Sequence, residues 1–96
     1  MKLSTVFRHA ARLVEQGVVD YSCTAVTRAS AQLGYCPSEY PCRAYQCLIS
    51  PRAEGYLSPS DFEPWRYCNP RALALARNHR VLALCMAAVL ADEEGL

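Results

Sequence analysis

The chain is short of lysine, of net charge and of repeated sequence. Lys2 is the only lysine among ten basic residues, and the formal net charge at pH 7 is +1. A charge so close to zero provides no general attraction to nucleic acid or to an acidic membrane, and we therefore expect neither as a partner. The other nine basic residues are arginines. Arginine suits planar, bidentate contacts at interfaces, although GC-rich coding DNA yields the same preference.

Strand patterns are absent as well. No segment alternates β-branched and polar residues in the way that is typical of a β-strand. All six prolines lie between positions 37 and 70, so the segments on either side can form uninterrupted helices. With 96 residues, of which 52% are hydrophobic and 20% charged, the chain can close one core but not two. We therefore predict one all-α domain over residues 1–96, a compact bundle of four to five helices.

The helices are predicted from hydrophobic spacing and from glycine and proline. Apolar residues at three- and four-residue steps predict a first helix over 3–16, which ends at Gly17. A second, over 22–33, ends at Gly34, and a third covers about 39–49. Asn69-Pro70 opens a helix over 70–78, and another follows over 79–92, with a kink or short break at 78–80. Residues 50–69 are expected to form an irregular, proline-rich loop.

The run from Val81 to Ala91 is the most apolar part of the chain. It contains no charged residue and is apolar on every side of a helix, which is typical of a helix enclosed by other protein. It is too short to cross a bilayer, which takes roughly 20 apolar residues. We expect this helix at the centre of the bundle, covered by the first two helices, with the Cys85 thiol in the core. The acidic residues that follow oppose the helix dipole, so the tail should fray.

The six cysteines are expected to be reduced. Arg8 and His9 interrupt the apolar segment that a secretory signal would need, so we expect the chain to stay in the cytoplasm. The spacing Cys36-x5-Cys42-x4-Cys47, with Cys68 and a histidine, offers a possible zinc site. Structural zinc sites normally use pairs two to four residues apart, so scattered reduced thiols are the preferred interpretation and no cofactor is predicted.

No catalytic arrangement is visible in the sequence. A cysteine nucleophile needs a base and an orienting group, and no spacing joins Cys23 to Asp20, His9 or His79. Asp61 and Glu63 lie together in the loop, but acidic residues at helix starts commonly serve the helix dipole. We therefore predict a protein that is not an enzyme.

Aromatic residues and arginines concentrate in the middle of the chain. Tyrosine, tryptophan and arginine dominate binding hot spots, although tyrosines also seal the edges of small helical cores. The predicted partner-binding residues are Tyr56, Trp65, Arg66, Tyr67, Arg43 and Arg52. One alternative is a nucleic-acid-binding regulator that uses Arg8, Arg12 and Arg28 against phosphates, and another is a zinc-stabilised module. A homodimer through the apolar 81–91 helix is also left open.

Stretches near the two ends of the chain carry a resemblance to known sequences. They are MKLSTV at residues 1–6 with YSCTAV at 21–26, and RVLALCMAA at 80–88 with its Ala-Asp-Glu-Glu tail. Together they resemble small accessory proteins encoded by tailed bacteriophages and prophages. The resemblance implies action in the cytoplasm of a bacterial host, by binding a host protein or defence complex as anti-CRISPR inhibitors do.

Overall fold

The computed structural model describes residues 1–35, 40–49 and 70–96, and the side chains of these ranges other than those of 70–76. Four helices make up this part of the chain: α1 (Leu3–Glu15), α2 (Ser22–Leu33), α3 (Tyr40–Ile49) and α4 (Pro70–Glu93). It contains no strand, so the predicted all-α class is confirmed. The proline-rich loop predicted over 50–69 lies outside the described residues. Among the described helices, none is long and apolar enough to span a bilayer.

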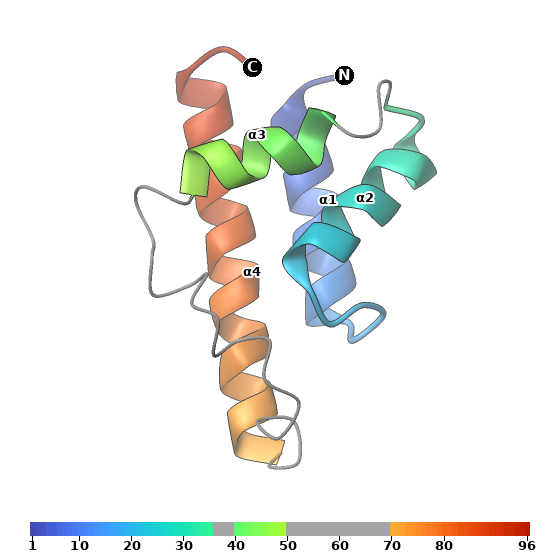
Figure 1. Cartoon of the computed structure of the whole chain (residues 1–96), viewed down its shortest axis with the longest axis vertical. Coiled ribbons are helices and arrows are strands. Elements are labelled where there is room, and N and C mark those ends of the chain that lie inside the picture. The colour runs from blue at the N-terminus through green and yellow to red at the C-terminus, as the bar shows by residue number, and fades with distance from the viewer. Residues whose placement is uncertain (36–39, 50–69) are drawn as a thin grey trace.

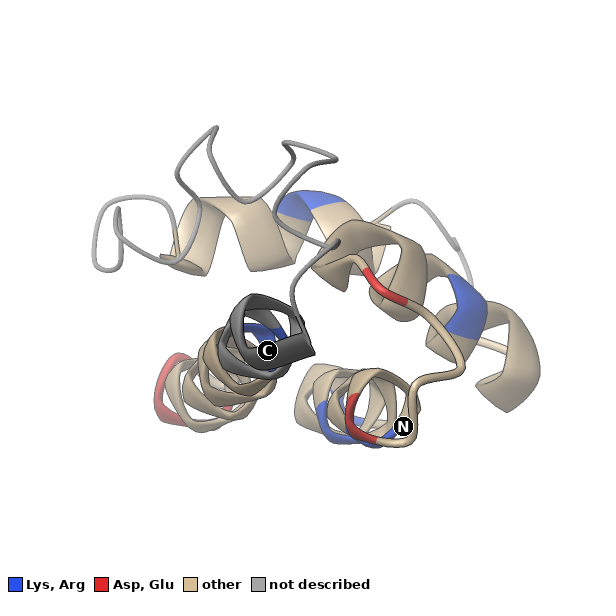
Figure 2. Cartoon of the chain, turned by 90° about the horizontal axis from the view of Figure 1, so that it is seen from below, with Lys and Arg blue, Asp and Glu red and all other residues tan. Residues whose placement is uncertain are grey.

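The helices form two layers. In one layer α1 and α4 lie side by side and antiparallel, and their contact is the most extensive in the fold (Figure 1). In the other layer α2 and α3 cover one side of that pair (Figure 2). The shortest dimension of the molecule is 17 Å, which accommodates two layers of helices about 10 Å in diameter and no third. Among the described residues, the second layer therefore covers the α1–α4 pair from one side only.

The core is built around the apolar stripe of α1. Its buried hydrophobic residues recur every three or four positions and are Leu3, Val6, Phe7, Ala10, Ala11, Leu13 and Val14. Opposite them α4 presents mostly small side chains: Ala83, Leu84, Ala87, Ala88 and Ala91 are all buried. Small residues let two helices approach closely. From the second layer, Tyr45 of α3 meets Phe7 edge to face, with ring centroids 5.9 Å apart.

Glycine ends the first two helices at the positions expected. Gly17 and Gly34 have φ values of 76° and 70°, in the left-handed region that glycine adopts without steric cost. After α2, the Tyr35 N–H donates to the Ser30 carbonyl at 2.9 Å, which satisfies one of the last free carbonyls of the helix. Gly17 thus turns the chain from α1 towards α2, and Gly34 turns it out of α2.

The break predicted at residues 78–80 is wrong, because α4 continues through it as one helix. The reason is tertiary. Arg80 is only 4% exposed, and its guanidinium lies over the Tyr21 ring at 5.2 Å from the ring centroid. This cation–π contact holds the arginine against the start of α2 and favours the continuous helix that places it there.

The 81–91 segment is buried along one side, as predicted, but it is not enclosed on every side. Leu82 and Val89 are 55% and 53% exposed, and Cys85 between them is exposed too, so its thiol is not in the core. All three lie on the side of α4 opposite the buried alanines. In the described part of the chain α1 and α3 pack against one side of α4, and an apolar stripe is left on its opposite side.

Arg8 in the middle of α1 forms an ion pair with Asp92 in the last turn of α4. The guanidinium Nη2 donates to Asp92 Oδ2 at 3.0 Å, between two partly exposed side chains. The Ser4 hydroxyl also lies close enough to lower the pKa of Asp92, and the hydrogen bond and charge of Arg8 lower it further. α4 ends at Glu93, one residue beyond the predicted end, and the fraying expected of the acidic tail stays a prediction.

Two leucines of α4 provide a test of the layered packing. Leu84→Ala should lower the free energy of unfolding by about 2–5 kcal/mol because it empties a buried site. Leu82→Ala should lower it by about 1 kcal/mol or less because that side chain is largely in solvent. Urea denaturation of both variants measures the difference. Equal losses would mean that the outer side of α4 is covered.

The Arg8–Asp92 contact should also give a pH dependence. Because the folded-state pKa of Asp92 lies below its ordinary value of 3.8, the contact stabilises the fold above that value and is lost as the pH falls through the lowered pKa. The melting temperature of Asp92→Asn should be below that of the wild type near neutral pH, and the two should converge in acid. Glu93→Gln, at the neighbouring exposed carboxylate, is the control and should show no such convergence.

Candidate functional site

Only one of the predicted partner-binding residues falls in the described structure. Arg43 is exposed on α3. The others, Tyr56, Trp65, Arg66, Tyr67 and Arg52, lie outside the described residues. The surroundings of Arg43 therefore provide the starting point for a candidate binding site.

Arg43 lines a groove between α3 and the C-terminal end of the chain. The groove has a volume of about 330 Å³, and its lining residues are Tyr40, Arg43, Ala44, Cys47, Leu48, Glu94 and Leu96. Ala44 and Leu48 are buried and form an apolar floor, whereas Tyr40 and Leu96 are each 40% exposed. The groove thus combines a partly exposed aromatic ring with a charged group of each sign, a combination suited to a protein side chain.

The chain end reaches the groove because α4 stops in a tight turn. Gly95 has a φ of 74°, and the Leu96 N–H donates to the Ala91 carbonyl at 2.9 Å. This is the usual glycine-terminated end of a helix, and it turns the following residue back alongside the helix. Leu96 is thereby brought towards α3 (Figure 1). Sequence reasoning missed Glu94 and Leu96, although the glycine at position 95 was the available signal for the turn.

A second group of reactive side chains lies where the start of α2 meets α3 and α4. Gln46 Nε2 of α3 donates to Cys23 Sγ at 3.6 Å. The pKa of Cys42, one turn before Gln46, is raised to about 11 by burial, by the charge that Cys23 carries when ionised and by a hydrogen bond with Cys23. The two thiols therefore face each other across the α2–α3 contact, and both are half-buried.

Tyr45 lies behind the two thiols. Its side chain is fully buried, and burial is the main reason that the pKa of its hydroxyl is raised. Oη makes no hydrogen bond of ordinary geometry, although Ser22 lies close enough to lower the pKa in part and the charge of Arg80 acts in the same direction. The arrangement keeps the phenol neutral.

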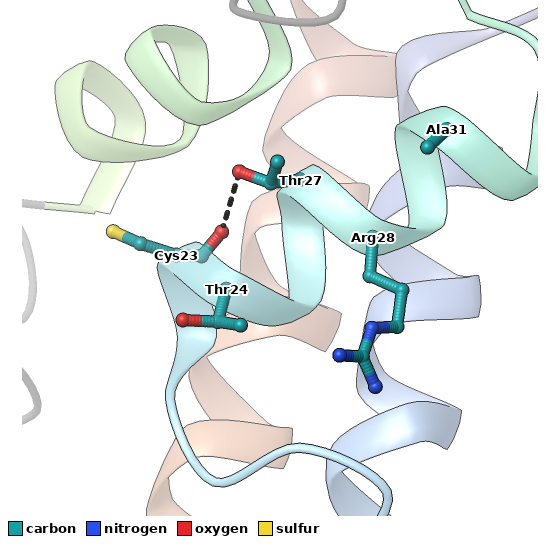
Figure 3. Close-up of a pocket in the computed structure, with 5 residues that line it drawn as sticks. All are labelled: Cys23, Thr24, Thr27, Arg28 and Ala31. Carbon is teal, nitrogen blue, oxygen red and sulfur yellow. Dashed lines mark hydrogen bonds between the residues drawn. The ribbon is translucent and has the colours of Figure 1, made fainter.

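The outer surface of α2 carries a shallow depression beside Cys23. It is lined by Cys23, Thr24, Thr27, Arg28 and Ala31 (Figure 3). The Thr27 hydroxyl is used within the helix, because it donates to the Cys23 carbonyl at 3.0 Å. Since α2 alone supplies the lining among the described residues, that part of the structure gives the depression no second wall that would position a ligand.

The described residues give little support to the two alternative functions, a nucleic-acid-binding regulator and a zinc-stabilised module. Of the three arginines assigned to phosphates, Arg8 is engaged by Asp92, and the charges of both signs are spread over the described surface (Figure 2). Among the described residues, no three histidine, cysteine or acidic side chains are grouped for a metal ion. Two of the four thiols of the zinc hypothesis, Cys36 and Cys68, lie outside those residues, so that hypothesis is not tested.

The role of the Tyr45 hydroxyl can be tested by removing it. Tyr45→Phe should change the free energy of unfolding by about 1 kcal/mol or less, since a buried hydroxyl without a good partner stabilises nothing. Tyr45→Ala should cost about 3–5 kcal/mol because it also removes the ring that meets Phe7. Chemical denaturation measures both. A large loss in Tyr45→Phe would show that the hydroxyl is hydrogen bonded after all.

Comparison with known proteins adds one finding: no protein-family model, curated protein or solved structure matches this chain.

Proposed function

We propose that this chain is a non-enzymatic protein-binding module and that the groove between α3 and the chain end is part of its binding surface. The observation that carries the proposal is the position of Arg43. It was selected from the sequence as an interface residue, and it lines an open groove with an apolar floor.

The groove contains the elements of a small binding hot spot. A partner's apolar side chain would bury the exposed parts of Tyr40 and Leu96 and rest on the floor of Ala44 and Leu48. The Arg43 guanidinium and the Glu94 carboxylate would place charges of both signs beside it. Opposite charges at one groove also favour a partner that carries both signs over one that carries a single sign.

The groove is too small to be the whole interface. Stable protein complexes bury about 800 Å² on each partner, which is more than these few exposed side chains supply. The proposal therefore keeps the contacts that the sequence assigns to Tyr56, Trp65, Arg66, Tyr67 and Arg52 as the remainder of the interface.

The partner proposed is a bacterial protein. The resemblance of the chain ends to phage and prophage accessory proteins supports action in the cytoplasm of a bacterial host. It further supports a host defence complex as the target, inhibited in the way that anti-CRISPR proteins inhibit theirs. Binding alone would suffice for such inhibition, and none of the residues of the groove needs a catalytic role.

Site-specific photocrosslinking tests the groove directly. A photoreactive phenylalanine at position 40 should capture a defined protein from bacterial lysate, whereas the same residue at Gln32, exposed on α2, should not. With the captured partner purified, Arg43→Glu should weaken binding by about tenfold or more, equivalent to about 1.4 kcal/mol. Arg12→Glu, which places the same charge change on the exposed side of α1, is the matched control and should bind normally.

Three results would contradict the proposal. They are equal capture from positions 40 and 32, equal affinity of Arg43→Glu and the wild type, and captured material that is nuclease-sensitive with binding that falls steeply with salt. The last would instead favour the nucleic-acid-binding regulator.

A further inference from the structure

The paired thiols of Cys23 and Cys42 are not used by the proposed binding groove. Cys23 belongs to the first turn of α2 and Cys42 to the first turn of α3. Nineteen positions separate them in the sequence, yet both lie at the contact of α2 with α3. Gln46, one turn after Cys42, donates to Cys23 Sγ at 3.6 Å, and each cysteine is half-buried. A small oxidant can therefore reach a pair of sulfur atoms that are already neighbours.

The two sulfurs differ in their surroundings. Cys23 receives the Gln46 amide N–H at 3.6 Å and lies at the positive end of the α2 dipole. The first turn of α2 has no acidic residue, and its N-cap residue makes no side-chain hydrogen bond to the helix. Burial, together with the neighbouring Cys23, raises the pKa of Cys42 to about 11, so its thiol stays protonated at neutral pH. Of the two sulfurs, Cys23 is therefore the one that already accepts a hydrogen bond from a neighbouring side chain.

We propose that Cys23 and Cys42 are a redox modification site that forms a reversible disulfide between α2 and α3 on reaction with a hydroperoxide. The Cys23 thiolate attacks the terminal peroxide oxygen, an S–O bond forms and the O–O bond breaks. This yields Cys23 sulfenic acid and, with hydrogen peroxide, one water after protonation. Cys42 sulfur then attacks Cys23 sulfur, the S–S bond forms and the S–O bond breaks. The Cys42 proton and the departing hydroxide leave as the second water.

The reaction is reversed by a thiol reductant. Two electrons and two protons from a dithiol return both cysteines to the reduced form, and the reductant becomes a disulfide. The net oxidation consumes two thiols and one hydrogen peroxide and releases two waters, so no other cofactor is required.

The chain provides matched controls for this pairing. Cys47 lies on α3 five residues after Cys42, which is about 140° further round the helix, and it is exposed. Cys85 is exposed on the outer side of α4. Both are more accessible to solvent than Cys23 and Cys42, so a reaction governed by exposure alone would select them.

Peptide mapping after oxidation tests the proposal. The full chain is treated with increasing hydrogen peroxide, the remaining thiols are alkylated, and the digested peptides are identified by mass spectrometry. The Cys23–Cys42 cross-link should exceed any Cys23–Cys47 cross-link by about tenfold or more, because the effective concentration of the paired thiols is higher. It should disappear on treatment with dithiothreitol. Cys47→Ser and Cys85→Ser should leave it unchanged.

Single variants of the pair separate the two roles. Cys42→Ser should stop the reaction at Cys23 sulfenic acid, which a cyclic 1,3-diketone traps, whereas Cys23→Ser should leave Cys42 as a free thiol. A variant in which Cys36, Cys47, Cys68 and Cys85 are all serine should still form the cross-link, with circular dichroism as the check that each variant is folded.

Two outcomes would overturn the proposal. The first is predominant pairing of Cys23 or Cys42 with another cysteine. The second is a wild-type chain in which Cys47 and Cys85 are oxidised while Cys23 and Cys42 remain free.

Discussion

The contact between the large apolar stripe of α1 and the small-residue side of α4 is the constraint on which the rest of the fold depends. Phe7 and its neighbours on α1 fill the space that the alanines of α4 leave, and Tyr45 closes that space from the second layer. The ion pair of Arg8 with Asp92 adds a surface contact between the middle of α1 and the last turn of α4. With α1 and α4 in place, α3 can lie across both, and its two sides become the two candidate sites.

α3 joins the two kinds of chemistry found in this structure. Arg43 and Leu48 belong to the groove shared with the chain end. Cys42 and Gln46 belong to the contact with α2, where the thiols meet. A ten-residue helix thus carries a recognition surface and a reactive pair at once. Any displacement of α3 relative to α2 would change the geometry of the groove and of the thiol pair together, because residues of the two sites alternate along one helix.

Much of the fold could be predicted from the sequence, because local signals decide it. The spacing of apolar residues in α1 and the glycines at positions 17 and 34 depend on helix geometry alone, and both were read correctly. The predictions that fail concern α4: the break at 78–80 and the enclosure of 81–91. How much of α4 is buried depends on how the helices are layered and not on its own sequence. An apolar run looks the same whether it is covered on all sides or on one, so Leu82 and Cys85 could not be assigned. Arg80 looked like part of a break because its stacking partner, Tyr21, is far away in sequence.

The candidate sites were less predictable for the same reason. Arg43 could be selected by residue type, but the groove exists only because Gly95 turns the chain end towards α3. Cys23 and Cys42 share no motif spacing, and only the packing of α2 on α3 makes them a pair. The turn at Gly95 also has a practical consequence. Leu96 is part of the groove wall, so an affinity tag or fusion partner joined after it would start at the proposed recognition surface. Met1, which is 71% exposed, offers an attachment point that is not part of the groove lining.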